Sequence, residues 1–394
     1  MYFYLSKDYS NNFPKCYDIK NFKLSTDLGW HETQGKFGKL IFKGYAYTNL
    51  KDFLETHDPE MVHHHHGSFT AIMEKDNKIF VVHDNSREYP LFINEDNMTI
   101  TNLTRNDKTK YPDVSLHIDC EQNKIKESYL EYEFQKKDDV SMSTTADVVL
   151  DILNNDIRVF ANTYKNPIKV VPTGGMDSTL LIAILKHNNV DFEVIDYEHK
   201  KWTYFYKKNR QAVNANINEG VFTSVGHTWG EEPMTLANGW HADQQFFRCY
   251  LPLAVFCKAK SINLYDQLEK YKEAYSYQFL HNEISERQAQ LSATLNGITD
   301  SQSAYKRMFE IIRASFQPWN FEKTLYWSPF KNLNITKNVL QMRDADILDN
   351  SFNASLQKMI LNKIDPNLLD VITPKKNEFD KSAYDKFTKT LLKY

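Results

Sequence analysis

The segment from Pro172 to Thr179 reads PTGGMDST and is the strongest candidate for chemistry in this chain. Gly174 and Gly175 let the backbone approach a phosphate, and Thr173, Ser178 and Thr179 supply hydroxyl groups beside the N–H groups of a helix start. Asp177 is suited to hold a magnesium ion against the same phosphates. Because Gly-Gly turns before helices are common, the segment alone leaves a plain structural turn as an alternative.

The flanking residues predict the elements that position this turn. The β-branched run that ends at Val171 predicts a buried strand, and the apolar residues after Asp177 predict a helix. Asp191–Tyr197 and Val221–Val225 have the composition of two further strands. This alternation predicts an α/β domain with a doubly wound parallel sheet, whose ligands lie at the carboxyl ends of the strands. Val171, at such an end, is a candidate for the nucleotide pocket.

Length and composition limit the class of protein. The 394 residues are enough for two domains, and 41% hydrophobic content fits a folded chain. A formal net charge of -3 argues against a dedicated nucleic-acid or anionic-membrane binder. With no signal-like or membrane-spanning apolar run, we expect a cytoplasmic protein with no membrane partner. The four scattered cysteines favour neither a zinc site nor a disulfide framework and are expected to be buried thiols.

The first part of the chain is rich in predicted strands. Tyr2–Leu5, Leu40–Tyr47 and Thr99–Leu103 have strand composition, and Ser68–Met73 with Lys78–His83 predicts a hairpin. The polar sequence after residue 135 then breaks the pattern. We therefore predict one domain over residues 1–135 and a second over 140–394.

Two motifs of the second domain resemble the asparagine-synthetase-like ATP-dependent amide ligases. PTGGMDST resembles the SGGxDS pyrophosphate loop (PP-loop) of that family, with Thr173 at the usual serine and Asp177 at the magnesium-binding aspartate. Asn238–Phe246, NGWHADQQF, resembles the GxGxDExF segment. There Asp243 matches the second metal-binding aspartate, and Gln244 replaces a glutamate.

Two more segments continue the resemblance in the same order. Ser328–Met342 is similar to the PFLD segment and its helix, with Asn332 in place of the aspartate. Thr373–Phe379, TPKKNEF, is similar to the RxKxxF segment, whose lysine reaches the reaction centre. The resemblance therefore implies that Lys376 is the active-site lysine, although a solvated lysine pair on a loop is the plain alternative.

The first domain resembles the class II glutamine amidotransferase half of the same family. Gly67–Phe92 is similar to its GxF…DRxGxxPLY stretch, with Asp84, Arg87, Pro90 and Leu91 in place. The resemblance implies an αββα fold of the Ntn-hydrolase type. That family uses an N-terminal cysteine as nucleophile, and this chain begins Met1-Tyr2. We therefore expect a degenerate domain without glutaminase activity.

The resemblance implies a ligase that forms an amide bond and depends on ATP and Mg. A carboxylate would attack the α-phosphorus of ATP, giving an acyl-adenylate and pyrophosphate, and an amine other than glutamine-derived ammonia would complete the amide. The substrates would be a small-molecule or peptide carboxylate and an amine, and a nucleobase is an alternative substrate. The sequence does not indicate an oligomeric state. The alternatives are a catalytically inactive scaffold or binding protein and a nucleobase-modifying PP-loop ligase.

Overall fold

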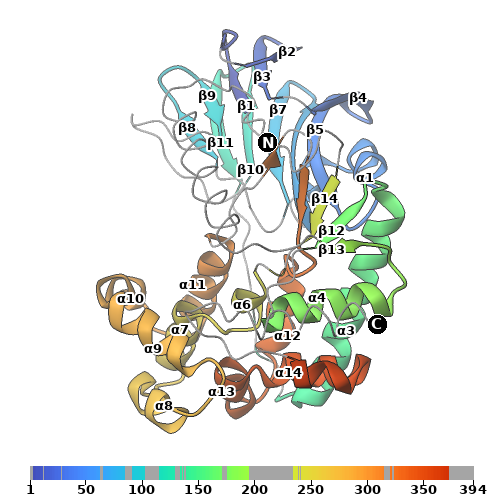
Figure 1. Cartoon of the computed structure of the whole chain (residues 1–394). Helices are drawn as coiled ribbons and strands as arrows, with labels where there is room; N and C mark the ends of the chain where they lie inside the picture. The colour runs from blue at the N-terminus through green and yellow to red at the C-terminus, as the bar shows by residue number, and fades with distance from the viewer. Residues whose placement is uncertain are drawn as a thin grey trace. The chain divides into compact units, whose positions relative to one another are not determined.

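The computed structural model describes residues 3–11, 13–27, 29–62, 65–84, 91–102, 115–128, 134, 136, 139–170, 175–194, 234–237, 239, 241–314, 320–321 and 324–371. These residues form a mixed α/β protein with antiparallel sheets and several helices (Figure 1). Two compact units are distinguished. The first contains Met1–Glu131, Glu198–Thr235 and Gln317–Tyr326, and the second contains Tyr132–Tyr197, Leu236–Phe316 and Trp327–Tyr394.

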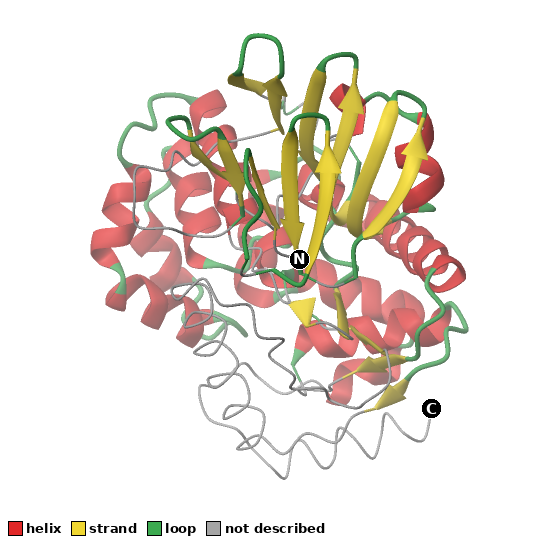
Figure 2. Cartoon of the chain, turned by 90° about the horizontal axis from the view of Figure 1, so that it is seen from above, coloured by secondary structure: helices red, strands yellow, loops and turns green. Residues whose placement is uncertain are grey.

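Two antiparallel sheets make up most of the first unit, and their strands are drawn in yellow in Figure 2. The first sheet has the order β2-β3-β1-β9-β8, with bounds Lys15–Ile19, Phe22–Thr26, Phe3–Ser6, Thr99–Thr101 and Phe92–Asn94. The second has the order β11-β10-β7-β6-β5-β4, with bounds Lys124–Ser128, Ser115–Asp119, Lys78–His83, Gly67–Lys75, Gly38–Ala46 and His31–Gly35. The predicted hairpin is β6 and β7, which pair from Thr70↔His83 to Lys75↔Lys78.

Alternation along β6 explains how these sheets pack. Ile72 joins a core shared by both sheets, which includes Phe3 and Leu24 of the first sheet. Phe69 and Met73 point to the other side, where they pack with Leu54 of a helix. That helix, α1 (Leu50–Thr56), and the single turn α2 (Pro59–Val62) were missing from the sequence prediction. Sheet, sheet and helix therefore form three layers, and the complete αββα order of the Ntn-hydrolase type stays a prediction.

The third sheet carries the first chemical motif. Its order is β13-β12-β14-β16-β15, with bounds Glu193–Val194, Ile168–Val170, Met234–Ala237, Thr324–Trp327 and Asn320–Phe321. The strands β12 and β13 are parallel and are joined through helix α4 (Met176–His187), as predicted. The strands β15 and β16 are antiparallel, so the sheet is mixed. A doubly wound arrangement beyond this β–α–β unit stays a prediction, because Val221–Val225 lies outside the described residues.

Helices complete the second unit. Their bounds are α3 Met142–Thr163, α6 Ala242–Gln245, α7 Tyr250–Ala259, α8 Leu264–Lys270, α9 Tyr277–Glu286, α10 Gln288–Leu295, α11 Ser301–Ala314, α12 Leu333–Val339, α13 Asp344–Asn353, α14 Ser355–Ile364 and a 3₁₀ turn at Pro366–Val371. The helices α3, α4 and α14 pack on one another (Figure 1). Every residue of α4 from Ser178 to Leu185 is buried, which makes α4 the central helix of this unit.

The described residues also test two expectations drawn from composition. Cys257 is buried and Cys16 is exposed on β2, so the prediction of four buried thiols is wrong for Cys16. Within the described parts of the chain, no helix has both the length and the apolar composition needed to cross a bilayer.

Candidate functional site

The site is built on the N-terminus of α4. Gly175 precedes the helix with φ -84° and ψ 167°, an extended conformation that other residues also adopt. The Thr179 N–H donates to the Gly175 carbonyl at 3.1 Å. The hydroxyls of Ser178 and Thr179 donate to that same carbonyl, at 3.1 Å and 2.8 Å. Both hydroxyl protons are therefore used inside the first turn, and a phosphate approaching this state would depend on backbone N–H groups.

The two aspartates singled out from the sequence meet at this helix start. Arg248, which follows α6, donates from Nη1 to Asp177 Oδ1 at 2.8 Å, and its Nη2 lies 3.1 Å from Asp243 Oδ1. The arginine is 1% exposed, while the two aspartate side chains are 23% and 20% exposed. Burial opposes the charge on Arg248, but the Asp177 and Asp243 carboxylates outweigh it and hold the pKa of the guanidinium above its usual value.

This arrangement does not fit the magnesium site expected between the two carboxylates. The guanidinium stands between the oxygens that a bridging cation would use, and Arg248 is 1% exposed. Within the described residues, no group of three or more His, Cys, Asp or Glu side chains converges at one point. The metal roles of Asp177 and Asp243 stay predictions.

A close backbone approach brings the second motif to the first. A Cβ built on Gly239 would lie 2.8 Å from the Asp177 carbonyl carbon, 2.9 Å from Asp177 Cβ and 2.9 Å from Ser178 N. Two of these three atoms belong to backbone and cannot move without shifting the first turn of α4. Glycine is therefore required at 239 because of space, which explains this position of the NGWHADQQF segment.

We expect Gly239→Ala to separate the two motifs. The added methyl group must push residue 239 away from α4, so we predict a loss of about 1–3 kcal/mol in the free energy of unfolding. Urea unfolding measures this loss. Gly35→Ala is the control, because the nearest atoms to a Cβ there lie at 3.5 Å, ordinary contact. An equal, small effect of both substitutions would contradict the packing argument.

Three further side chains close the site, and none belongs to a motif found in the sequence. Gln357 of α14 donates from Nε2 to Asp177 Oδ1 at 2.8 Å and accepts from Arg248 Nη1. The guanidinium of Arg248 lies 5.7 Å from the centre of the Tyr275 ring, and burial, partly offset by Arg248, raises the pKa of Tyr275 to about 12. Lys358 Nζ lies 5.5 Å from the centre of the Tyr275 ring, and burial lowers the pKa of this lysine.

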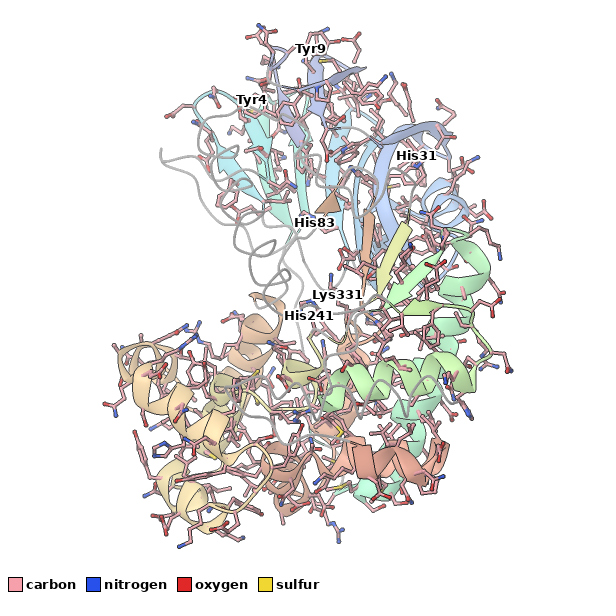
Figure 3. All side chains as sticks on the ribbon, viewed as in Figure 1. Tyr4, Tyr9, His31, His83, His241 and Lys331 are labelled. Carbon is pink, nitrogen blue, oxygen red and sulfur yellow. The ribbon has the colours of Figure 1, made fainter. Side chains whose placement is uncertain are left out.

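His241 and Lys331 bring the second and third motifs together (Figure 3). His241 begins α6 in a left-handed conformation, with φ 74°. Burial lowers the pKa of His241 well below its usual value, and the charge of Lys331 lowers it further. Lys331 is 3% exposed although it is a lysine, and it follows the predicted Ser328-Pro329-Phe330 segment. Its burial beside His241 could not be read from the sequence.

Asn332, which replaces the aspartate expected in the third motif, has a structural role. Its Oδ1 accepts from the Asn334 N–H at 2.9 Å and so caps helix α12. Its Nδ2 donates to Asp156 Oδ2 on α3 at 2.7 Å. An aspartate at 332 could form the cap, but it would place a second carboxylate against Asp156 in place of this donor.

Several predicted site residues lie outside the described residues. They are Val171, Thr173, Gly174 and Lys376, so their proposed roles stay predictions. Of the amidotransferase-like stretch, Asp84 is described, and its Oδ2 accepts from the Phe69 N–H at 3.0 Å. Asp84 is 2% exposed, so in this unit it joins β7 to β6 from inside the fold.

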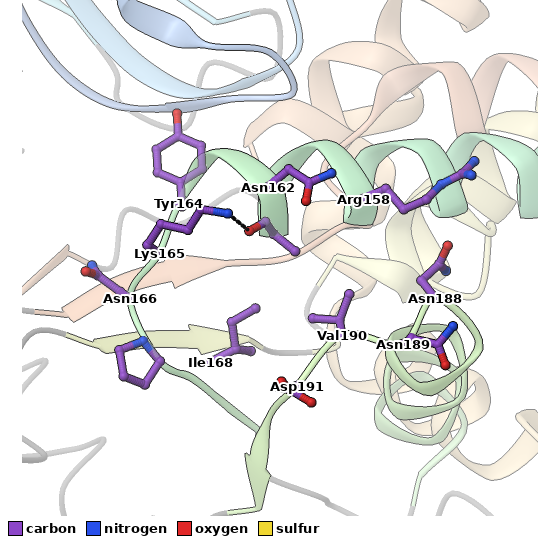
Figure 4. Close-up of a pocket in the computed structure, with 12 residues that line it drawn as sticks. Arg158, Asn162, Tyr164, Lys165, Asn166, Ile168, Asn188, Asn189, Val190 and Asp191 are labelled. Atoms are coloured by element: carbon purple, nitrogen blue, oxygen red, sulfur yellow. Dashed lines mark hydrogen bonds between the residues drawn. The ribbon is translucent and has the colours of Figure 1, made fainter.

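A hollow lies at the opposite end of β12 and α4 (Figure 4). It has a volume of about 500 Å³ and is lined by Pro167 and Ile168 at the start of β12 and by Asn188 and Asn189 beyond the end of α4. Lys165 points across it and donates to the Ala161 carbonyl at 3.3 Å. Because the predicted motif residues lie at the other end of these elements, this hollow is separate from the candidate site.

The sequence and the structure were compared with protein families, curated proteins and solved structures. No family model matches the sequence, and no curated protein matches it. Among solved structures, the chain is similar to the glutamine phosphoribosylpyrophosphate amidotransferase of B. subtilis complexed with ADP and GMP, with 11% identity and a TM-score of 0.20. The match covers 57% of this chain and 63% of that one, so the chain spans less than two thirds of its length. A likeness this weak carries no argument about function.

Proposed function

We propose that this protein is an ATP-dependent ligase that activates a carboxylate as an acyl-adenylate and transfers the acyl group to an amine. The observation that carries the proposal is the convergence of Asp177 and Asp243 on Arg248 at the start of α4. The two aspartates come from separate motifs that were paired on sequence alone. They meet at the N-terminus of α4, and the N-terminus of a helix in an α/β unit is a favourable place for a phosphate group.

In this proposal the chain's own groups do the work of binding and charge compensation. Backbone N–H groups at the start of α4 face the departing pyrophosphate, and Lys331 is a buried positive charge in the same unit. Lys376 is proposed to neutralise the charge that develops on the adenylate and on the tetrahedral intermediate. Magnesium, where the reaction needs it, would enter as a complex of the nucleotide substrate. The carboxylate and the amine are small-molecule or peptide substrates.

Pyrophosphate exchange into ATP, measured with a panel of carboxylic acids, tests the proposal. We expect exchange that depends on one acid and falls at least about 100-fold in Lys376→Ala, because a cation at the reaction centre is lost. Asp151→Ala, on the exposed face of α3, is the control and is expected to retain exchange. Nucleotide binding without exchange for any acid would contradict the ligase.

A second candidate is an inactive binding protein of the same architecture. One observation favours it: Arg248 already neutralises the acidic pair. Under this candidate the site is a structural junction. Calorimetric titration with ATP separates the two, because a junction without a nucleotide site gives no heat of binding, whereas the ligase requires one.

A further inference from the structure

Arg248 is fixed in the centre of the acidic pair from several directions. Its backbone N–H donates to the Asp243 carbonyl at 2.7 Å, in a turn that includes Phe247 at φ 60°. Its side chain reaches both carboxylates and also donates to Gln357, which is fully buried. The guanidinium carbon lies 5.7 Å from the centre of the Tyr275 ring. The position of the guanidinium is therefore defined by three helices and a tyrosine.

The contact geometry is that of a counter-ion. Two carboxylates this close to one another repel and need a positive charge between them. A divalent cation meets this need with carboxylate oxygens as ligands. A guanidinium meets it with a rigid, planar set of N–H donors and stays charged at every pH the protein experiences. Here Asp177 Oδ1 accepts a hydrogen bond from Nη1, and Asp243 Oδ1 lies 3.1 Å from Nη2 as an ion pair.

We propose that Arg248 is the resident cation of this site and takes the place of a divalent cation between Asp177 and Asp243. The two aspartates then hold α4 and α6 together through the arginine and do not recruit a metal ion. The inference rests on the proposed function only in one respect: it assumes that the N-terminus of α4 is a nucleotide site. Its structural part can be tested with no nucleotide present.

The test measures Mn²⁺ binding by the full chain without nucleotide, from the electron paramagnetic resonance signal of free Mn²⁺. Thermal unfolding is followed in parallel with Mg²⁺ or with EDTA. We expect the wild-type chain to bind no Mn²⁺ through these aspartates and to unfold at the same temperature in both buffers. Mn²⁺ binding by the wild-type chain that disappears in Asp243→Asn would overturn the proposal.

Removing the arginine is expected to create the metal site. In Arg248→Ala, we predict Mn²⁺ affinity at least ~10-fold above wild type and an unfolding temperature that rises with Mg²⁺. Adding Asp243→Asn to this variant should remove both effects. A folded Arg248→Ala protein that binds Mn²⁺ no more tightly than wild type, and whose unfolding temperature does not change with Mg²⁺, would contradict the proposal. If Arg248→Ala is recovered only in the presence of Mg²⁺, that rescue supports it, and the wild-type measurement still decides the outcome when no protein is recovered.

Arg287→Ala is the matched control. Arg287 Nε lies 3.3 Å from Glu283 Oε2, but the arginine is 50% exposed and pairs with one carboxylate along a helix. Its removal should leave both Mn²⁺ binding and the Mg²⁺ response unchanged. Failure of ATP to bind the wild-type chain would remove the proposed function and leave these metal measurements intact, so the two failures are distinguishable.

Discussion

Replacing Arg248 by alanine is expected to lower the free energy of unfolding by about 3–5 kcal/mol in metal-free buffer. The substitution removes a side chain that is 1% exposed and leaves two carboxylates, 23% and 20% exposed, without the cation between them. It also removes the hydrogen bond that Arg248 donates to the buried Gln357 Oε1, and it leaves that oxygen without this donor. The loss reflects the uncompensated charges that remain as well as the contacts that disappear.

Urea unfolding followed by circular dichroism measures this loss. Arg287→Ala supplies the scale for an exposed ion pair, where about 0–1 kcal/mol is expected because water solvates both charges well. Arg248→Lys keeps a positive charge and loses the planar set of donors, so we expect an intermediate loss. An Arg248→Ala protein within about 1 kcal/mol of wild type would mean that the carboxylates find another partner.

The pattern of residues predicted local elements well where one periodicity governs them. The β6–β7 hairpin follows from alternation, with Ile72 and Met73 on opposite faces. The strand β12 and the helix α4 follow from a β-branched run and an apolar run on either side of a glycine pair. The resemblance of two segments to the ligase family also implied that Asp177 and Asp243 lie close together. Each of these features depends on neighbours in the chain or on a recognised segment.

The remainder of the site depends on contacts that no local pattern encodes. Arg248 directly follows Phe246 and Phe247, and nothing in that sequence shows that it turns back toward Asp177. Gln357 lies on the amphipathic helix α14, far along the chain. A glutamine in such a helix is normally expected on its exposed face. Asp156 of α3 is an aspartate that is only 5% exposed. The tertiary fold determines which buried polar side chains pair with one another, so hydrophobic periodicity along the chain does not predict these pairs.

Asp156 is expected to make stability depend on pH in a direction opposite to that of most carboxylates. Burial raises the pKa of Asp156 to about 7, and the hydrogen bond from Asn332 opposes the rise only in part. In the unfolded chain the pKa of an aspartate is about 3.9. Because the folded state favours the protonated form, stability falls as pH rises from about 4 to about 7, and the loss is complete above that range.

Asp156→Asn is therefore expected to stabilise the protein at pH 8 by up to about 4 kcal/mol and to have little effect at pH 4. The amide carries no charge to desolvate, and its oxygen can still accept from Asn332 Nδ2. Urea unfolding of wild type and variant at both pH values measures the difference. Asp151→Asn, exposed on the same helix, is the control and should change stability equally at the two values. A gain for Asp156→Asn that is the same at pH 4 and pH 8 would show that the benefit is not electrostatic, since only an ionised carboxylate at position 156 gives the wild-type chain a penalty that grows with pH.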